Sequence, residues 1–147
     1  MEDKILQGVN VVSYKKEDKK FGMSCAWATQ VDYDSILLLI GSQSETGNNL
    51  KLGDKVGVSA LNKEQIKIAL AFGDNHSLSF DKFKNVDYFY EDSAILIKDA
   101  KTNLVCEVTN ISHPKCSKED YLIECKILKE FEYKNAEFLS MVDIHNL

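Results

Sequence analysis

Short runs in which apolar and polar residues alternate, separated by polar turns, make up most of this chain. Alternation over roughly four to eight residues is typical of half-buried β-strands. The run Ile-Leu-Leu-Leu-Ile at 36–40 lacks alternation, which predicts a central strand buried on both faces. The last run mixes alternation with apolar pairs, as expected of a bulged or curved strand. The predicted strands span residues 9–14, 21–31, 36–40, 55–61, 86–90, 94–98, 104–111 and 121–131.

One segment between the predicted strands has the pattern of a helix. Asn62 suits the N-cap position, and Gln65 stands three residues later, where a capping box places it. Gly73 ends the pattern. A further short helix is expected at 48–52, and the tail 134–147 forms either a terminal helix or a partner-facing segment. The apolar stripe of the main helix consists of Ile66, Ala69 and Leu70.

Seven or eight short strands with one or two short helices predict a mainly β fold, an antiparallel barrel with inserted helices. The 147 residues are expected to form a single domain over 1–147. A net charge of −5 without a basic stripe argues against a nucleic-acid partner. The apolar runs are far shorter than the roughly 20 residues that span a bilayer, and the N-terminus lacks a signal-peptide pattern. We therefore expect a cytoplasmic protein without a membrane partner.

The titratable residues do not form a recognisable metal or catalytic motif. The four cysteines lack C-x-x-C spacing, and the three histidines are widely separated, so no metal site is predicted. Cys106 and Cys125 lie in apolar runs and are expected in the core, whereas Cys116 lies in a polar loop and could be a reactive thiol. The common catalytic motifs are absent from the sequence. If the protein is an enzyme, we expect a cofactor to supply the chemistry, and no catalytic residue can be named.

The stretch around the single tryptophan, Trp27, is unusually poor in side-chain bulk. Small residues inside a strand often mark close approach by another backbone or a ligand. A flat aromatic ligand would need such exposed peptide groups with a large ring beside them. The alternative is an ordinary core tryptophan. The small residues around the ring are Ser24, Cys25, Ala26 and Ala28.

Two further segments could hold an anionic group. The loop at 41–49 carries the hydroxyl groups of Ser42, Ser44 and Thr46 and opens toward a predicted short helix, which suits a phosphate. Alternatively, it is an ordinary polar connection in which Thr46 caps the helix. In the segment 77–84, Lys82 could reach an anion or lie on a solvated face.

Taken in order, these segments resemble the flavin reductase-like family of FMN-binding split barrels. The family pattern begins with Gly-Val-x-Val-Val, here 8–12, and continues with a small-residue strand centred on Trp, here 24–31. A Thr-containing loop, a Val-x-Val-x-x-Leu strand leading into Glu-Gln, a Phe-Gly pair and a later Asp-Lys-Phe follow. These are represented by Thr46, 56–65, 72–73 and 81–83, so that the match covers roughly residues 5–130. The resemblance implies an FMN-binding split β-barrel of Greek-key type.

The resemblance also implies roles for individual positions. The strand at 24–30 would lie along the flavin and its ribityl chain, through backbone groups and Thr29, with Trp27 close to the rings. The loop hydroxyls would hold the phosphate or the ribityl chain, and Lys82 would supply positive charge across a homodimer interface. Tyr121 stands where many members have the histidine of Gly-Asp-His, and it could stack or hydrogen-bond. The implied cofactor-binding residues are Ser24, Cys25, Ala26, Trp27, Ala28, Thr29, Ser42, Ser44, Thr46, Lys82 and Tyr121.

Three functions are compatible with this sequence. The first is an FMN reductase that takes electrons from NADH or NADPH and passes them to an acceptor. The second is an FMN-binding electron carrier, of flavoredoxin type, that serves a redox partner protein without oxidising NAD(P)H itself. The third is a split barrel that binds another group, such as haem or a deazaflavin.

Overall fold

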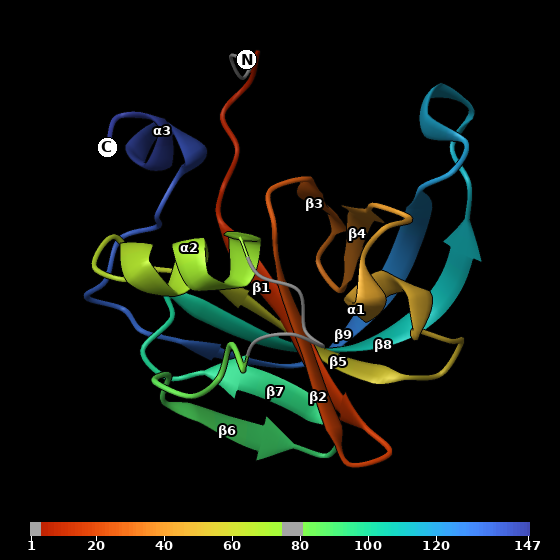
Figure 1. The fold of residues 1–147 in the computed structure, drawn as a ribbon, viewed down its shortest axis with the longest axis horizontal. Coiled ribbons are helices and arrows are strands. Elements are labelled where there is room, and N and C mark those ends of the chain that lie inside the picture. Colours follow the sequence, from red (N-terminus) through yellow and green to blue (C-terminus); the bar gives the residue numbers. More distant parts are fainter. Residues whose placement is uncertain (1–3, 75–80) are drawn as a thin grey trace.

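The computed structural model describes residues 4–74 and 81–147, and in these residues an antiparallel sheet of nine strands forms the body of the molecule (Figure 1). Its strand order is β3-β4-β9-β8-β5-β1-β7-β6, and β2 pairs with β1 outside this path. The strands are β1 Asn10–Lys16, β2 Lys19–Cys25, β3 Ala28–Asp32, β4 Ser35–Ile40, β5 Lys55–Ala60, β6 Tyr88–Glu91, β7 Ala94–Ile97, β8 Thr102–Ser112 and β9 Tyr121–Glu132. The helices are α1 Glu45–Asn48, α2 Ile66–Asp74, η1 Lys115–Ser117 and α3 Met141–His145.

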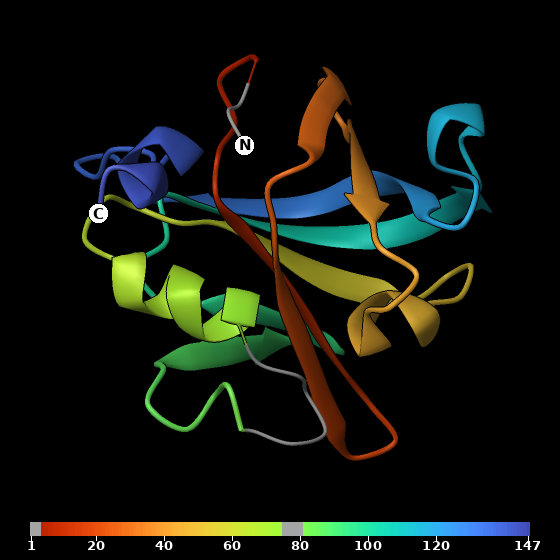
Figure 2. The ribbon, with the colours of Figure 1, turned by 45° about the horizontal axis from the view of Figure 1, so that its top comes forward.

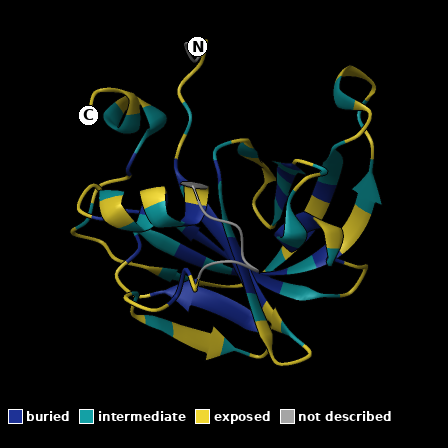
Figure 3. Cartoon of the chain, in the orientation of Figure 1, coloured by how far each residue is buried: buried dark blue, intermediate teal, exposed yellow. Residues whose placement is uncertain are grey.

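The β1–β2 hairpin divides the molecule into two halves. Glu17 and Asp18 form its turn with positive φ angles of 52° and 64°, which suits the twist of a tight hairpin. Two views show α2 on one side of the hairpin and α1 on the other (Figures 1 and 2). One apolar core lies among β1, β2, β4, β5, β8 and β9, and a second lies beneath α2. Figure 3 shows the buried residues concentrated along the hairpin and β7.

The predicted strand at 21–31 is wrong in one respect, because it is two strands. β2 ends at Cys25, which pairs with Asn10, and β3 begins at Ala28, which pairs with Leu38. Ala26 and Trp27 carry the chain from the hairpin to the other half of the barrel. The break is imposed by a change of pairing partner, which the local pattern does not reveal.

The strand at 36–40 exists, but the prediction that both its faces are buried is wrong. Ile36, Leu38 and Ile40 point into the core, whereas Leu37 and Leu39 are only half-buried on the outer face. The expected irregularity in the last strand is confirmed. Val105 pairs with Lys129 and Cys106 with Ile127, so that Leu128 is an extra, bulged residue.

The hydrogen bonds predicted for a cap at Asn62 are present, although α2 itself begins later, at Ile66. The Glu64 N–H donates to the Asn62 side-chain oxygen at 2.7 Å, and the Asn62 N–H donates to Gln65 Oε1 at 3.0 Å. The predicted stripe is partly wrong, because Leu70 is exposed and Phe72 is the buried partner of Ala69. The helix expected at 48–52 lies earlier, at α1, and Ser44 rather than Thr46 caps it.

The C-terminal tail closes one end of the barrel. Leu139 is buried, its N–H donates to Leu61 O, and its carbonyl accepts from Val9 N–H. Isolated bridges join Gly8 to Ser140 and Asn62 to Phe138. The tail is therefore tied to the start of β1 and to the end of β5, and it continues into α3. In the described part of the chain, no helix is long and apolar enough to cross a membrane.

Candidate functional site

Trp27 lies at the crossing from β2 to β3, with its backbone fixed and its side chain half exposed. Its carbonyl accepts from Leu39 N–H at 2.9 Å, and the neighbouring Cys25 carbonyl accepts from the Asn10 side-chain amide at 3.1 Å. The side chain is 53% exposed, so Trp27 is not a core tryptophan. An exposed large ring with a fixed backbone is available to contact a ligand.

An apolar surface surrounds this ring, formed by Trp27, Leu37, Leu39 and Leu122, which we call the Trp27 face. Leu39 pairs with Leu122 across β4 and β9, and Leu37 pairs with Thr29 of β3. Since β3 pairs only with β4 among the described strands, its other edge leaves backbone polar groups without strand partners. A pocket of about 330 Å³ lies on this face, lined also by Ala28, Thr29 and the N-terminal residues Ile5, Leu6 and Gln7.

The loop at 41–49, which we call the serine-rich loop, begins two residues after Leu39 of the Trp27 face. Ser42 donates its N–H to Asp120 Oδ1 at 3.0 Å. Ser44 Oγ accepts from Gly47 N–H at 3.1 Å and donates to Met23 Sδ at 3.0 Å. Thr46 is buried, and its carbonyl accepts from the Tyr14 hydroxyl at 2.5 Å. These contacts hold the loop against β1, β2 and Asp120, which precedes β9.

Tyr121 lies beside this loop, on the α1 side of β9. Its hydroxyl donates to Asn48 Oδ1 at 2.7 Å, and its ring centroid lies 5.5 Å from that of His113. His113 Nδ1 lies 2.9 Å from Asp120 O, so the geometry favours the tautomer with the proton on Nδ1. Hydrogen bonds from the Ser117 hydroxyl and then from Ser42 N–H hold the pKa of Asp120 below its usual range.

Lys82 lies on the opposite side of the hairpin. Its side chain is almost fully buried, and Nζ donates to Gly22 O at 2.9 Å and to Phe72 O at 3.4 Å. Burial lowers its pKa, and no described carboxylate forms an ion pair with it. Ser24 is on this side as well, where its hydroxyl donates to Ala69 O at 2.8 Å. Within one chain, Lys82 is therefore not brought to the serine-rich loop.

The remaining predicted positions are in or near the core. Cys25 is buried, its thiol proton is shared between Trp27 O at 3.5 Å and Leu39 O at 3.7 Å, and burial raises its pKa to about 12. This thiol stays protonated and supports the crossing rather than reacting. Cys106 and Cys125 are buried as predicted, whereas Cys116 is exposed. Among the residues described, no cluster of three His, Cys, Asp or Glu side chains is placed to hold a metal ion.

Cys25 and Ala26 lie at the crossing from β2 to β3, and the other nine predicted cofactor residues fall into three groups. Trp27, Ala28 and Thr29 meet on the Trp27 face; Ser42, Ser44, Thr46 and Tyr121 lie around α1; Ser24 and Lys82 lie under α2. The sequence interpretation did not identify Leu37, Leu39 and Leu122. The only signal for Leu37 and Leu39 was the continuous apolar run at 36–40, which indicates burial without saying which face a ligand could cover. Leu122 lies in the strand predicted at 121–131, whose pattern does not single it out.

Comparison with known proteins agrees with this architecture. The structure resembles a Streptomyces globisporus NADH:FAD oxidoreductase, with a TM-score of 0.83 at 21% identity over 92% of this chain and 81% of that chain. It also resembles a flavoredoxin from Methanosarcina acetivorans, with a TM-score of 0.77 at 16% identity over 91% and 74% of the two chains. An FMN-binding protein from Thermus thermophilus gives a TM-score of 0.79 at 13% identity over 90% and 74%.

At these identities the structural matches establish the fold, and the predicted split-barrel class is confirmed. A search of curated protein sequences finds no match. The family described as flavin reductase like domain, in contrast, matches residues 2–130. Because this match covers most of the 147 residues, the chain belongs to the flavin reductase-like domain family.

Proposed function

We propose that this protein binds FMN on the Trp27 face and passes electrons from NADH or NADPH through it to an acceptor. The observation that carries the proposal is the half-exposed Trp27 ring beside the free edge of β3 and the serine-rich loop. Family membership supports a flavin as the bound group. The Streptomyces relative is an NADH:FAD oxidoreductase, which supports a nicotinamide as the electron donor.

The residues present fit a flavin in shape and polarity. A flavin ring system is flat, largely apolar and edged with hydrogen-bonding atoms. The pocket of about 330 Å³ offers leucine side chains for the ring faces, and the adjacent β3 edge offers backbone donors and acceptors for the ring edge. Thr29 would add a hydroxyl, and Ser42 with the loop that follows would lie toward the ribityl phosphate.

The protein's own contribution is orientation and exclusion of water. When bound, FMN supplies the redox chemistry. Trp27, Leu37 and Leu39 would cover an apolar surface of the flavin and keep water from it. The fixed carbonyl of Trp27 and the paired strand β4 would hold this surface in one geometry. Electron transfer between a bound nicotinamide and a bound flavin would then be effectively unimolecular.

We further propose that the protein acts as a homodimer. Ile5, Leu6, Trp27 and Val31 are 71%, 78%, 53% and 53% exposed. Ile5, Leu6 and Trp27 line the same pocket, and Val31 lies further along the β3 strand. Clustered exposed apolar side chains are typical of an interface. A second chain on this face would shield a flavin from both sides, and it offers the route by which Lys82 of one chain could act on the cofactor of the other.

A second candidate function is an FMN-binding electron carrier that does not oxidise NAD(P)H itself. Tyr121 supports it, because this residue stands where the family pattern has a histidine, and its hydroxyl is engaged by Asn48. Such a carrier would exchange electrons with a redox partner protein. The flavoredoxin match is compatible with this reading.

Absorption spectroscopy of the purified full chain tests both functions. We expect a flavin spectrum after reconstitution with FMN and removal of the excess, and sedimentation of the reconstituted protein as a dimer. Anaerobic mixing with NADH or NADPH should then bleach the flavin band. Bound FMN that neither nucleotide bleaches, but dithionite does, would replace the reductase by the carrier. Failure to retain FMN, combined with uptake of haem or a deazaflavin, would refute both.

A further inference from the structure

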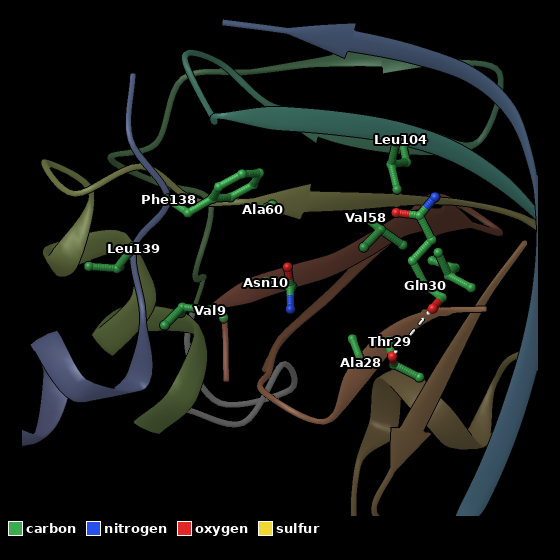
Figure 4. Close-up of a pocket in the computed structure, with 12 residues that line it drawn as sticks. Val9, Asn10, Ala28, Thr29, Gln30, Val58, Ala60, Leu104, Phe138 and Leu139 are labelled. Carbon is green, nitrogen blue, oxygen red and sulfur yellow. Dashed lines mark hydrogen bonds between the residues drawn. The ribbon is translucent and has the colours of Figure 1, made fainter. Parts of the chain in front are cut away.

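A second pocket lies on the inner side of the barrel, where the sheet remains open between β3 and β1. Its volume is about 260 Å³ (Figure 4). It shares Ala28 and Thr29 with the pocket on the Trp27 face and otherwise has different walls, including Asn10, Val58 and Leu104. The cofactor roles considered above do not use these inner walls.

The pocket exists because two strands that could close the barrel do not pair. β3 pairs only with β4 in the described sheet, while β1 pairs with β2, β5 and β7. Barrel interiors of this size are normally filled by side chains. Here the small Ala28 and Ala60 face the opening, and Phe138 of the tail forms its rim with 57% of its surface exposed. Figure 4 shows these side chains around a common space.

The lining defines what can bind there. Its walls are mostly apolar and contain no charged side chain, so an ion would lose hydration without gaining a partner. Its polar side chains are Thr29, whose hydroxyl donates to Gln30 O at 3.5 Å, and two side-chain amides. Asn10 Nδ2 donates to Cys25 O at 3.1 Å, and Gln30 Nε2 donates to Asp32 O at 3.0 Å. Their oxygens accept no hydrogen bond from the residues that the structure describes, and in Figure 4 both lie toward the pocket.

We propose that this pocket binds a small uncharged molecule with a single ring and a hydroxyl group that donates to the amide oxygen of Gln30. An apolar cavity of about 150 Å³ already accepts benzene, whereas drug-sized ligands need about 300 Å³ or more. The volume here lies between these limits and therefore selects one ring with a short substituent. The inference goes beyond the proposed FMN function and does not depend on it.

Phenol is the probe that tests this inference, in a nuclear magnetic resonance titration of the ¹⁵N-labelled full chain without added FMN. We expect saturable shifts at residues that line the pocket, and no saturable binding of benzoate, which has the same ring but a charge. Ala60→Leu fills the space and should weaken phenol binding at least tenfold. Ala136→Leu makes the same change outside the pocket and should leave the affinity unchanged.

Gln30→Leu keeps the test valid if Ala60→Leu fails to fold, because Gln30 is exposed on an edge strand. It should weaken phenol binding by about two- to tenfold, the value of one hydrogen bond, and leave toluene binding unchanged. Absence of saturable phenol shifts, equal binding of benzoate, or shifts outside the pocket would each overturn the proposal. An Ala60→Leu variant that no longer dimerises but still binds phenol would also overturn it, because the pocket would then be part of the interface between two copies of the chain.

Discussion

Replacing Trp27 by alanine should show whether its ring contacts a ligand or packs in the core. Trp27 is 53% exposed, so about half of its side-chain area is removed from water. For an aromatic side chain of roughly 150–250 Å² at about 25 cal/mol per Å², this burial contributes about 2–3 kcal/mol. We therefore expect Trp27→Ala to lower the free energy of unfolding by no more than that amount. Phe72→Ala is the matched core control, because Phe72 is 1% exposed and its loss should cost about 3–5 kcal/mol.

Urea unfolding followed by circular dichroism measures the stability change, and quenching of FMN fluorescence measures cofactor affinity. We expect Trp27→Ala to weaken FMN binding at least tenfold, about 1.4 kcal/mol, because it removes the ring beside the pocket. Trp27→Phe keeps a flat ring and should retain most of the affinity. The reasoning is refuted if Trp27→Ala is as destabilising as Phe72→Ala, or if its FMN affinity equals that of the wild type.

Three further predictions concern the family pattern, the cysteines and the pH dependence of stability. The family pattern assigns cofactor contacts to Thr46 and, from the partner chain of the proposed dimer, to Lys82. Thr46→Ala and Lys82→Ala should therefore each weaken FMN binding by about 1.5–3 kcal/mol in the same fluorescence assay, as expected for charge-assisted contacts, and unchanged affinity in both would remove these residues from the site. A thiol reagent such as DTNB should modify only Cys116 in the folded protein and four thiols in urea, because the other three cysteines are buried; rapid labelling of more than one folded thiol would contradict this burial. Burial raises the pKa of Cys25 from 9.0 to about 12, so the unfolded chain loses the thiol proton at a lower pH than the folded chain does. The stability that this thiol contributes is therefore fully present below pH 9. It declines by about 1.4 kcal/mol per pH unit as the pH rises from 9 toward 12. In urea unfolding at pH 8, 9 and 10, the free energy of unfolding should decline less steeply with pH for Cys25→Ala than for the wild type. An equal decline in both proteins would disprove the raised pKa of Cys25.

Local patterns predicted much of the secondary structure. The capping arrangement of Asn62 and Gln65 depends on residues three apart, and the structure contains both expected hydrogen bonds. Alternation located the strands to within a few residues, and apolar pairs near Leu128 indicated its bulge. These features depend on neighbours along the chain, which is why the sequence contains them.

Patterns could not show where a strand changes partners. The run at 21–31 reads as one strand, yet Cys25 pairs with β1 and Ala28 with β4. Likewise, the apolar run at 36–40 does not show that Leu37 and Leu39 lie on a half-exposed outer face. Both outcomes depend on which distant segments pair and cover one another, and this information is absent from a window of neighbouring residues.

The sequence by itself determined that the chain is a β-rich member of a flavin-binding family, because the order and spacing of its motifs are properties of the chain alone. Only the tertiary structure decided how those motifs are grouped. The Trp27 ring is half exposed beside Leu39 and the free edge of β3, whereas Lys82 is held under α2 by Gly22 and Phe72. Strand pairing and the two faces of the β1–β2 hairpin produce this separation, and both arise from contacts between residues far apart in sequence.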